Sequence, residues 1–362
     1  MYSIDPSLNH AGTLPASFYQ DPNAWELSKK RIFSRNWLYL GHEDEFQNGP
    51  ENVHPRWLLE NFLDEPVLVV REDQALRCLT NVCTHRGFLL AQHPAKMNRI
   101  VCQYHGRRFD LAGKFEAMPE FEEAADFPRP CDHLHQLPLE QWGPFLFTQI
   151  DSQVNFSVIR NQLEERLGFL PLQDMVYHPE YSKTYNVKAH WALYCDNYLE
   201  GFHIPFVHMD LRGILDYGDY STEVGDGMVL QVGYSNGKSF TFDLPEGHSD
   251  FGKDVTAYYY WIFPNIMLNV YPWGIQVNQV RPVTANFTKI DFWYYIWDHE
   301  TFELMDGLQL AEKTEREDEF VVEAVQRGLR SRFYPGGRFS PKREAGVHYF
   351  HRLIAEAMNA GD

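Results

Sequence analysis

The chain has 362 residues, of which 44% are hydrophobic and 23% are charged, as in an ordinary globular protein. Its formal net charge of -18 disfavours binding to nucleic acid or to an anionic membrane surface. No apolar run approaches the roughly 20 residues that span a bilayer, and the first residues lack a signal-peptide pattern. We therefore expect a cytoplasmic protein of about two domains.

The first half of the chain predicts a helical arm followed by a small β domain. Residues 17–37 are expected to form an N-terminal helix, with Pro22 near its start and an apolar face made by Trp25, Leu27, Ile32 and Phe33. From residue 37 to about 153, short apolar runs such as 66–70 and 145–147 alternate with turn residues, which is typical of an all-β domain.

The second half predicts helices at the ends of an antiparallel sheet, which is an α+β fold. The sequence has no long linker, so we divide it into an arm at 1–36, which should pack on the last domain, a β domain at 37–154 and an α+β domain at 155–362. The expected elements are helices at about 154–169 and 190–204, strands at 228–232, 257–263, 275–280 and 290–296, and helices at about 301–330 and 342–359.

Within the β domain, two short segments each offer one thiol and one imidazole. Cys83 and His85 stand in the first segment, and after sixteen residues Cys102 and His105 stand in the second. Such a pattern suits tetrahedral zinc, but it also suits a 2Fe-2S cluster in which two histidines replace two cysteines on one iron. The spacing is tighter than in a zinc finger, which favours the cluster. The remaining cysteines, Cys78, Cys131 and Cys195, are expected to be buried hydrophobic residues.

A second constellation follows much later in the chain. His203 and His208 are five residues apart, about 140° around a regular α-helix, so they can meet at one metal only if the helix is broken or locally widened. Pro205 lies between them and supplies a break. Two histidines and one carboxylate form the facial triad of non-haem Fe(II) oxygenases.

The third ligand of that triad is predicted to be Asp318. At about 100° per residue, Asp318 falls on the small, apolar stripe of its helix, where an aspartate is unfavourable unless it is paired or bound to a metal. The other residues of this stripe are Ala311, Thr314, Val322, Val325 and Leu329. The neighbouring Glu317 and Glu319 point about 100° away on either side and are expected to be solvated.

The two motifs together resemble those of the α subunit of Rieske non-haem iron oxygenases, in the branch of choline and carnitine monooxygenases. The resemblance extends from residue 36 to residue 329. It implies a Rieske 2Fe-2S cluster in the β domain and a mononuclear Fe(II) in the α+β domain. The cluster would be held by Cys83, His85, Cys102 and His105, and the Fe(II) by His203, His208 and Asp318.

The same resemblance implies an assembly and an electron path. Family members form head-to-tail trimers in which the cluster of one subunit faces the iron of the next. His105 of one subunit would then hydrogen-bond Glu200 of its neighbour, which would contact His203, and Asn197 would be a supporting residue near the iron. The chain has no dinucleotide-binding fingerprint, so the electrons would come from a separate ferredoxin or flavin reductase.

The predicted function is that of a terminal oxygenase, which uses O₂ to hydroxylate or N-demethylate a small substrate, possibly a quaternary ammonium compound. The aromatic residues at 258–261 and 271–273 fit such a cation. An aromatic-ring oxygenase or O-demethylase is the alternative within the enzyme class. A non-catalytic protein, with zinc or an iron–sulfur centre used only for binding or electron transfer, is the alternative outside it.

One departure from the family pattern concerns a charged segment. Many relatives have tryptophan after the His-Gly pair, where this chain has Arg107. Between residues 73 and 110 the chain has six basic residues and no acidic one, which predicts a basic rim for an acidic electron donor that docks near Arg107 and Arg108. The alternative is that some of these arginines pair with carboxylates from other segments.

Overall fold

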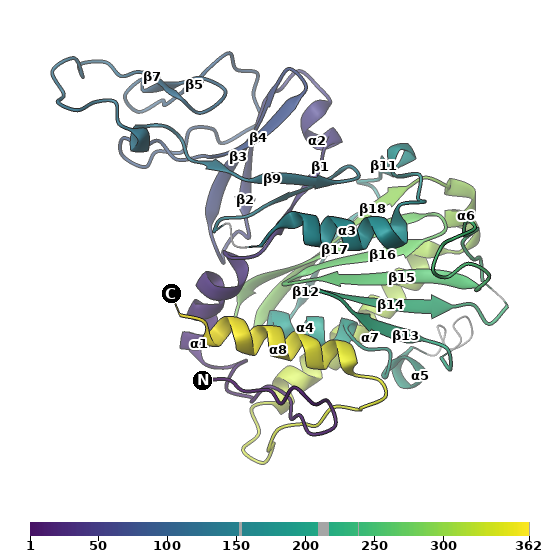
Figure 1. The fold of residues 1–362 in the computed structure, drawn as a ribbon. Coiled ribbons are helices and arrows are strands. Elements are labelled where there is room, and N and C mark those ends of the chain that lie inside the picture. The colour runs from purple at the N-terminus through teal and green to yellow at the C-terminus, as the bar shows by residue number, and fades with distance from the viewer. Residues whose placement is uncertain (152–153, 209–216, 238, 362) are drawn as a thin grey trace. The chain divides into compact units, whose positions relative to one another are not determined.

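The computed structural model describes residues 1–151, 154–208, 217–237 and 239–361. The chain divides into two units, one made of Met1–Phe33 and Asn155–Asp362 and the other of Ser34–Val154 (Figure 1). Both contain antiparallel sheets, and helices cover the sheet of the larger unit, so the predicted α+β fold class is confirmed. Among the described helices, none is long and apolar enough to cross a membrane.

The smaller unit contains three antiparallel sheets, in the orders β1-β10-β9, β2-β3-β4-β8 and β5-β6-β7. The strands form where the sequence has short runs of apolar residues, and β3 with its buried central residues is an example. The elements are β1 (Leu38–His42), α2 (Asp44–Gln47), β2 (Val53–Leu58), β3 (Glu65–Glu72), β4 (Ala75–Thr80), β5 (Ile100–Val101), β6 (Arg108–Phe109), β7 (Phe115–Ala117), the 3₁₀ turn η2 (Pro130–Asp132), β8 (Gln136–Leu137), β9 (Leu139–Trp142) and β10 (Phe145–Thr148).

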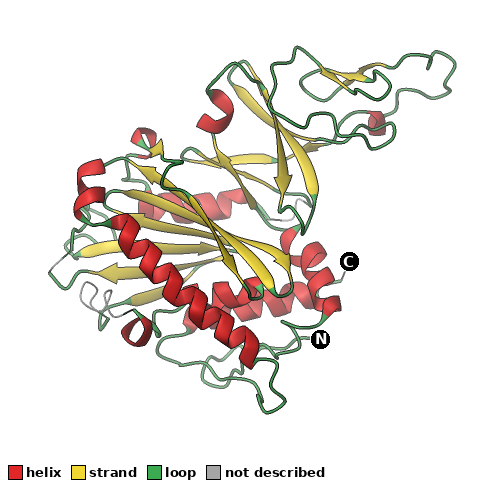
Figure 2. Cartoon of the chain, turned by 180° about the vertical axis from the view of Figure 1, so that it is seen from behind, coloured by secondary structure: helices red, strands yellow, loops and turns green. Residues whose placement is uncertain are grey.

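The larger unit is built on an eight-stranded antiparallel sheet in the order β11-β18-β17-β16-β15-β14-β13, with β12 also paired to β18. The central strands are buried on both faces because helices lie on each side (Figures 1 and 2). The strands are β11 (Val176–Tyr177), β12 (Lys183–Val187), β13 (Ser221–Val224), β14 (Met228–Tyr234), β15 (Val255–Ile262), β16 (Ile266–Tyr271), β17 (Gly274–Thr284) and β18 (Phe287–Ile296).

Helix α7 lies diagonally across one face of this sheet (Figure 2) and contacts α4, which in turn contacts β17 and α8. This places one face of α7 opposite the end of α4. The helices are α1 (Pro22–Ser28), the π-helical turn η1 (Lys29–Phe33), α3 (Phe156–Leu167), the 3₁₀ turn η3 (Leu172–Asp174), α4 (Trp191–Tyr198), α5 (Ile204–Val207), α6 (His299–Leu304), α7 (Gly307–Gly328) and α8 (Ala345–Asn359).

Several details differ from the sequence predictions. The helix predicted at about 301–330 is divided into α6 and α7, and the helix predicted at about 190–204 ends at Tyr198. The first helix begins only at Pro22, because the Asp21 side chain accepts a hydrogen bond from the Asn23 amide and caps it there. Strand β16 was not predicted, because it is buried along almost its whole length and shows no alternation. Cys78 and Cys195 are buried as expected, but Cys131 is exposed, so that prediction was wrong for Cys131.

Candidate functional site

Two loops of the smaller unit have the same backbone structure. In the first loop, the Gly87 amide donates to the Cys83 carbonyl at 3.0 Å, and in the second the Gly106 amide donates to the Cys102 carbonyl at 3.0 Å. Both glycines have φ of +73°, a left-handed conformation that glycine adopts without strain. Each of these turns closes a loop that carries one cysteine and one histidine.

The loops place two thiols inside and two imidazoles outside. Cys83 and Cys102 are 2% exposed and belong to one buried core, while His105 is exposed and His85 is half-buried. The His85 and His105 rings lie 4.9 Å apart, and Tyr104 stacks on His105 at 3.7 Å. Two sulfur donors on one side and two nitrogen donors on the other fit the asymmetric ligand set of a Rieske cluster.

Arg107 does not lie on the predicted basic rim. It is 1% exposed, and its Nη2 donates to the Asp132 Oδ1 at 2.8 Å and to the Asp132 carbonyl at 3.1 Å. Although burial alone raises the pKa of Asp132, the hydrogen bonds from Arg107 and Arg129 outweigh it and hold that pKa below its usual value. The pairing alternative therefore applies to Arg107. The guanidinium packs over the rings of Phe109, Phe115 and Phe127 at 5.7, 5.0 and 5.4 Å.

In the larger unit, a helix break sets the spacing of the two candidate iron-binding histidines. Helix α4 ends at Tyr198, and His203 and His208 stand at the two ends of the single-turn helix α5. Pro205 lies in the first turn of α5, where a missing N–H is tolerated, so it starts the short helix and does not interrupt a longer one. This geometry lets histidines five residues apart converge.

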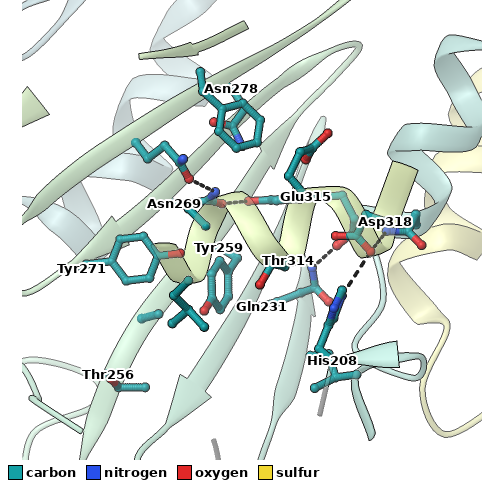
Figure 3. Close-up of a pocket in the computed structure, with 18 of the residues that line it drawn as sticks. His208, Gln231, Thr256, Tyr259, Asn269, Tyr271, Asn278, Thr314, Glu315 and Asp318 are labelled. Atoms are coloured by element: carbon teal, nitrogen blue, oxygen red, sulfur yellow. Dashed lines mark hydrogen bonds and ion pairs between the residues drawn. The ribbon is translucent and has the colours of Figure 1, made fainter. Parts of the chain in front are cut away.

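His203, His208 and Asp318 meet at one point, and Figure 3 shows His208 below Asp318 of α7. The Nε2 atoms of the two histidines lie 3.1 Å apart. The Asp318 Oδ1 lies 3.5 Å from the His203 Nε2 and 3.1 Å from the His208 Nε2. Two imidazoles and one carboxylate converging at these distances could hold a metal ion, and this donor set fits non-haem iron.

The other predicted site residues surround this triad. Glu200 Oε1 lies 2.7 Å from the His203 Nδ1, and its Oε2 accepts the His203 amide at 3.0 Å. Asn197 Nδ2 donates to the Asp318 Oδ1 at 2.7 Å. Glu200 therefore fixes the orientation of one imidazole, and Asn197 fixes the carboxylate.

Glu319 was predicted to be solvated, but its side chain is only 14% exposed and pairs with Arg316. The same prediction is also wrong for Glu317. Its Oε2 lies 2.7 Å from the Nδ1 of His208, so each candidate histidine ligand has its own acidic partner. Burial lowers the pKa of His208, but hydrogen bonds and charges from Asp318 and Glu317 outweigh it and raise that pKa. A metal cation at the Nε2 would take the place of the proton that these acids favour. The only sequence signal was an acid adjacent to the predicted ligand.

A cavity of about 170 Å³ adjoins the triad and lies between α7 and the sheet (Figure 3). Tyr259 and Tyr271 line it from β15 and β16, whereas Tyr258 on the opposite face of β15 packs on Phe242. From α7, Ala311 and Thr314 line it, as the helical stripe predicts. Other aromatic residues of its walls are Tyr194, Tyr198, Tyr220, Trp273, Phe292 and Tyr294.

Three buried oxygen atoms of the cavity lining have no hydrogen-bond partner among the described residues. They are the Oε1 of Gln231, the Oδ1 of Asn278 and the Oε1 of Glu315. The other oxygen of Glu315 accepts from the Tyr194 hydroxyl at 2.6 Å. Burial raises the pKa of Glu315 well above its usual value, and the neighbouring Asp318 and Glu319 raise it further, against that hydrogen bond. The sequence analysis did not single out Glu315.

Two protein families match the chain. Residues 36–128 match the Rieske 2Fe-2S domain, and residues 175–360 match the ring hydroxylating alpha subunit (catalytic domain). The chloroplastic choline monooxygenase of Beta vulgaris is 27% identical over 99% of this chain and 80% of that protein. The carnitine monooxygenase oxygenase subunit of Escherichia coli K12 is 28% identical over 96% of this chain and 94% of its own length.

The structural comparison agrees with these matches. The quaternary ammonium Rieske monooxygenase CntA, solved in complex with its substrate L-carnitine, has a TM-score of 0.77 to this chain at 25% sequence identity. The similarity covers 98% of this chain and 97% of CntA. Both units therefore have counterparts in a solved structure.

Proposed function

Because this chain belongs to the family of ring hydroxylating alpha subunits and carries a Rieske 2Fe-2S domain, we propose that it is a terminal oxygenase that hydroxylates or N-demethylates a small quaternary ammonium compound. The family and enzyme class predicted from the motifs are confirmed, and the non-catalytic alternative no longer applies. Choline and carnitine monooxygenases are the relatives described above, and this supports the proposed substrate class.

We assign the ligands as the sequence predicts. Cys83, His85, Cys102 and His105 hold the cluster within a Rieske domain at 37–154, and His203, His208 and Asp318 hold iron within a catalytic domain at 155–362, with the arm at 1–36 packed on that domain. The bound cofactors supply one-electron transfer and O₂ activation. The meeting of three donor atoms at one point supports the iron assignment.

In this scheme the protein residues orient the ligands and exclude water. Glu200 and Glu317 each hold the Nδ1 of one histidine, which leaves the Nε2 atoms facing the metal position. Asn197 fixes the Asp318 carboxylate by its hydrogen bond. The aromatic walls keep the substrate carbon close to this point and keep bulk water away.

One observation carries the choice of a cationic substrate, and it is the position of Glu315. Its buried Oε1 lines an aromatic cavity and finds no donor among the described residues. A trimethylammonium group offers no hydrogen bond, but it is held by aromatic faces and by a nearby carboxylate charge. A bound cation would also favour the ionised form of Glu315, whose pKa burial raises.

Replacing Glu315 by glutamine should raise the KM for a quaternary ammonium substrate about tenfold, because the attraction between the carboxylate and the cation, worth about 1.4 kcal/mol, is lost. The kcat should change little, since the same contact acts on substrate and transition state. Glu323→Gln is the matched control, because Glu323 stands on the same helix, accepts a hydrogen bond from the Lys188 amide and does not line the cavity. Steady-state O₂ uptake measures both constants, and an unchanged KM in Glu315→Gln would remove the proposed role.

We also propose a head-to-tail trimer in which His105 of one subunit hydrogen-bonds Glu200 of the next. His105 is exposed, and Glu200 already contacts His203. A carboxylate offers about four acceptor positions. Glu200 uses three of them, for the His203 imidazole and for the Phe202 and His203 amides, so one remains for a second histidine. The bridge would connect the cluster of one subunit to the iron of its neighbour.

Because Arg107 is buried, we propose that the electron donor docks at other, exposed basic residues. Arg86 and Arg108 are both exposed, and the Arg86 guanidinium lies 5.9 Å from the ring of Tyr104, which stacks on His105. An acidic ferredoxin or flavin reductase would be steered to this edge by their charge.

The double variant Arg86→Gln, Arg108→Gln should therefore be reduced more slowly by its protein donor at low ionic strength. The difference should vanish near 1 M salt, where the Debye length is about 3 Å. Stopped-flow reduction measures the rate, and Arg332→Gln, an exposed arginine of the larger unit, is the control. Reduction of the double variant by a small neutral reagent should stay unchanged. If the protein donor reduces the double variant as fast as wild type, with the same salt dependence, the donor docks elsewhere.

A further inference from the structure

Arg107 is a buried cation directly after the second cluster loop. It follows His105 and Gly106 in the sequence, and its carbonyl accepts the Cys102 amide at 2.8 Å, so it closes that loop. Its guanidinium is shielded from water by three phenylalanine rings and is paired with Asp132. A charge in such surroundings acts more strongly on its neighbours than one in water.

Asp132 connects this guanidinium to both cluster loops. Its carbonyl accepts from the Arg107 Nη2 at 3.1 Å and from the Thr84 hydroxyl at 2.9 Å, and Thr84 stands between Cys83 and His85. The Arg107 side chain is thus held next to the first loop, although it belongs to the second.

One N–H donor of the Arg107 guanidinium has no acceptor among the described residues. Its Nε is buried and has no hydrogen-bond partner among the described residues, while Nη2 is satisfied by Asp132. A buried N–H without an acceptor is unfavourable. The sulfur atoms of an iron–sulfur cluster accept hydrogen bonds, and the potential of a cluster depends on such bonds and on nearby charge.

We propose that Arg107 is a positioning residue that raises the reduction potential of the Rieske cluster. Reduction adds one electron from the donor protein and one negative charge to the cluster, and a buried cation stabilises the more negative form. The inference rests on the proposed cluster ligands.

The test is a redox titration of the purified full-length protein, followed by the EPR signal of the reduced cluster. Arg107→Gln and Arg107→Trp both remove the charge and should lower the reduced-to-oxidised ratio at a given potential about tenfold, which is 59 mV for a one-electron couple. Arg107→Lys should stay closer to wild type than either, because it keeps the charge.

Asp132→Asn should shift the midpoint potential in the opposite direction. It removes the counter-charge of Arg107, so the midpoint potential should rise, whereas a purely structural role for the pair would shift both variants in one direction. Arg129→Gln is the control, because Arg129 is mostly exposed and contacts the other oxygen of Asp132. Acid-labile sulfide shows that each variant retains its cluster.

An Arg107→Gln or Arg107→Trp variant with full cluster content and the wild-type midpoint would overturn the proposal. A shift of the same sign in Asp132→Asn would also overturn it. Failure of the proposed cluster assignment looks different, since the wild-type protein would then lack the Rieske EPR signal altogether.

Discussion

Replacing Asp318 by alanine is expected to abolish turnover, because it removes one of the three atoms that converge at the candidate iron site. The Asp318 Oδ1 faces the Nε2 atoms of His203 and His208 and is itself held by Asn197. Two histidines alone leave the metal with too few protein ligands, and loss of the metal removes O₂ activation. Coupled O₂ uptake should fall to background.

The Rieske spectrum of this variant should be intact, because the two sites share no ligand. The iron-to-sulfide ratio should drop to that of the cluster alone, which metal analysis measures. Glu319→Ala, one residue further along α7, is the matched control and should keep its iron, since Glu319 pairs with Arg316. Normal iron content and normal activity in Asp318→Ala would mean that the third ligand lies elsewhere.

Glu200→Gln should keep both metal centres and slow the transfer of electrons to the mononuclear site by about tenfold or more. Glutamine can still accept from the His203 Nδ1, but it lacks the negative charge that strengthens a hydrogen bond to each of two imidazoles, an effect of roughly 1.5 to 3 kcal/mol. Single-turnover kinetics of the prereduced enzyme would report the change directly.

Glu200→Asp separates charge from shape in this experiment. It keeps the carboxylate on a shorter side chain and should retain more of the rate than glutamine does. Unchanged kinetics in Glu200→Gln would remove the bridge from the mechanism. Loss of iron in that variant would instead assign Glu200 to holding His203 in place.

Much of the site could be predicted because several of its ligand residues lie close to one another in the sequence. Each cluster loop contains its thiol, imidazole and glycine within a few residues, and the structure shows the turns that this spacing requires. Asp318 was found from helical periodicity, since an acid on an apolar stripe needs a partner. The stripe was imperfect, because Val325 is 44% exposed.

What the sequence could not predict depends on contacts between distant segments. Arg107 was read as a surface residue because its own segment holds no acid, whereas its partner Asp132 is 25 positions away. Glu317 was read as solvated because helical periodicity places it beside the apolar stripe, and no pattern connects it to His208 across 109 positions. The position of Glu315 in the cavity wall could likewise not be predicted, because the aromatic residues around it come from the distant strands β15 and β16.

The most direct test of the proposed function is substrate-dependent O₂ uptake by the anaerobically purified protein with a reductase and NAD(P)H. We expect uptake with a quaternary ammonium compound such as choline or carnitine, together with a reduced Rieske EPR signal and iron in excess of the cluster. Uptake only with a planar aromatic acid would contradict the substrate class and favour an aromatic-ring oxygenase. Absence of the Rieske signal, with zinc in its place, would contradict the proposed cofactors and the mechanism that rests on them.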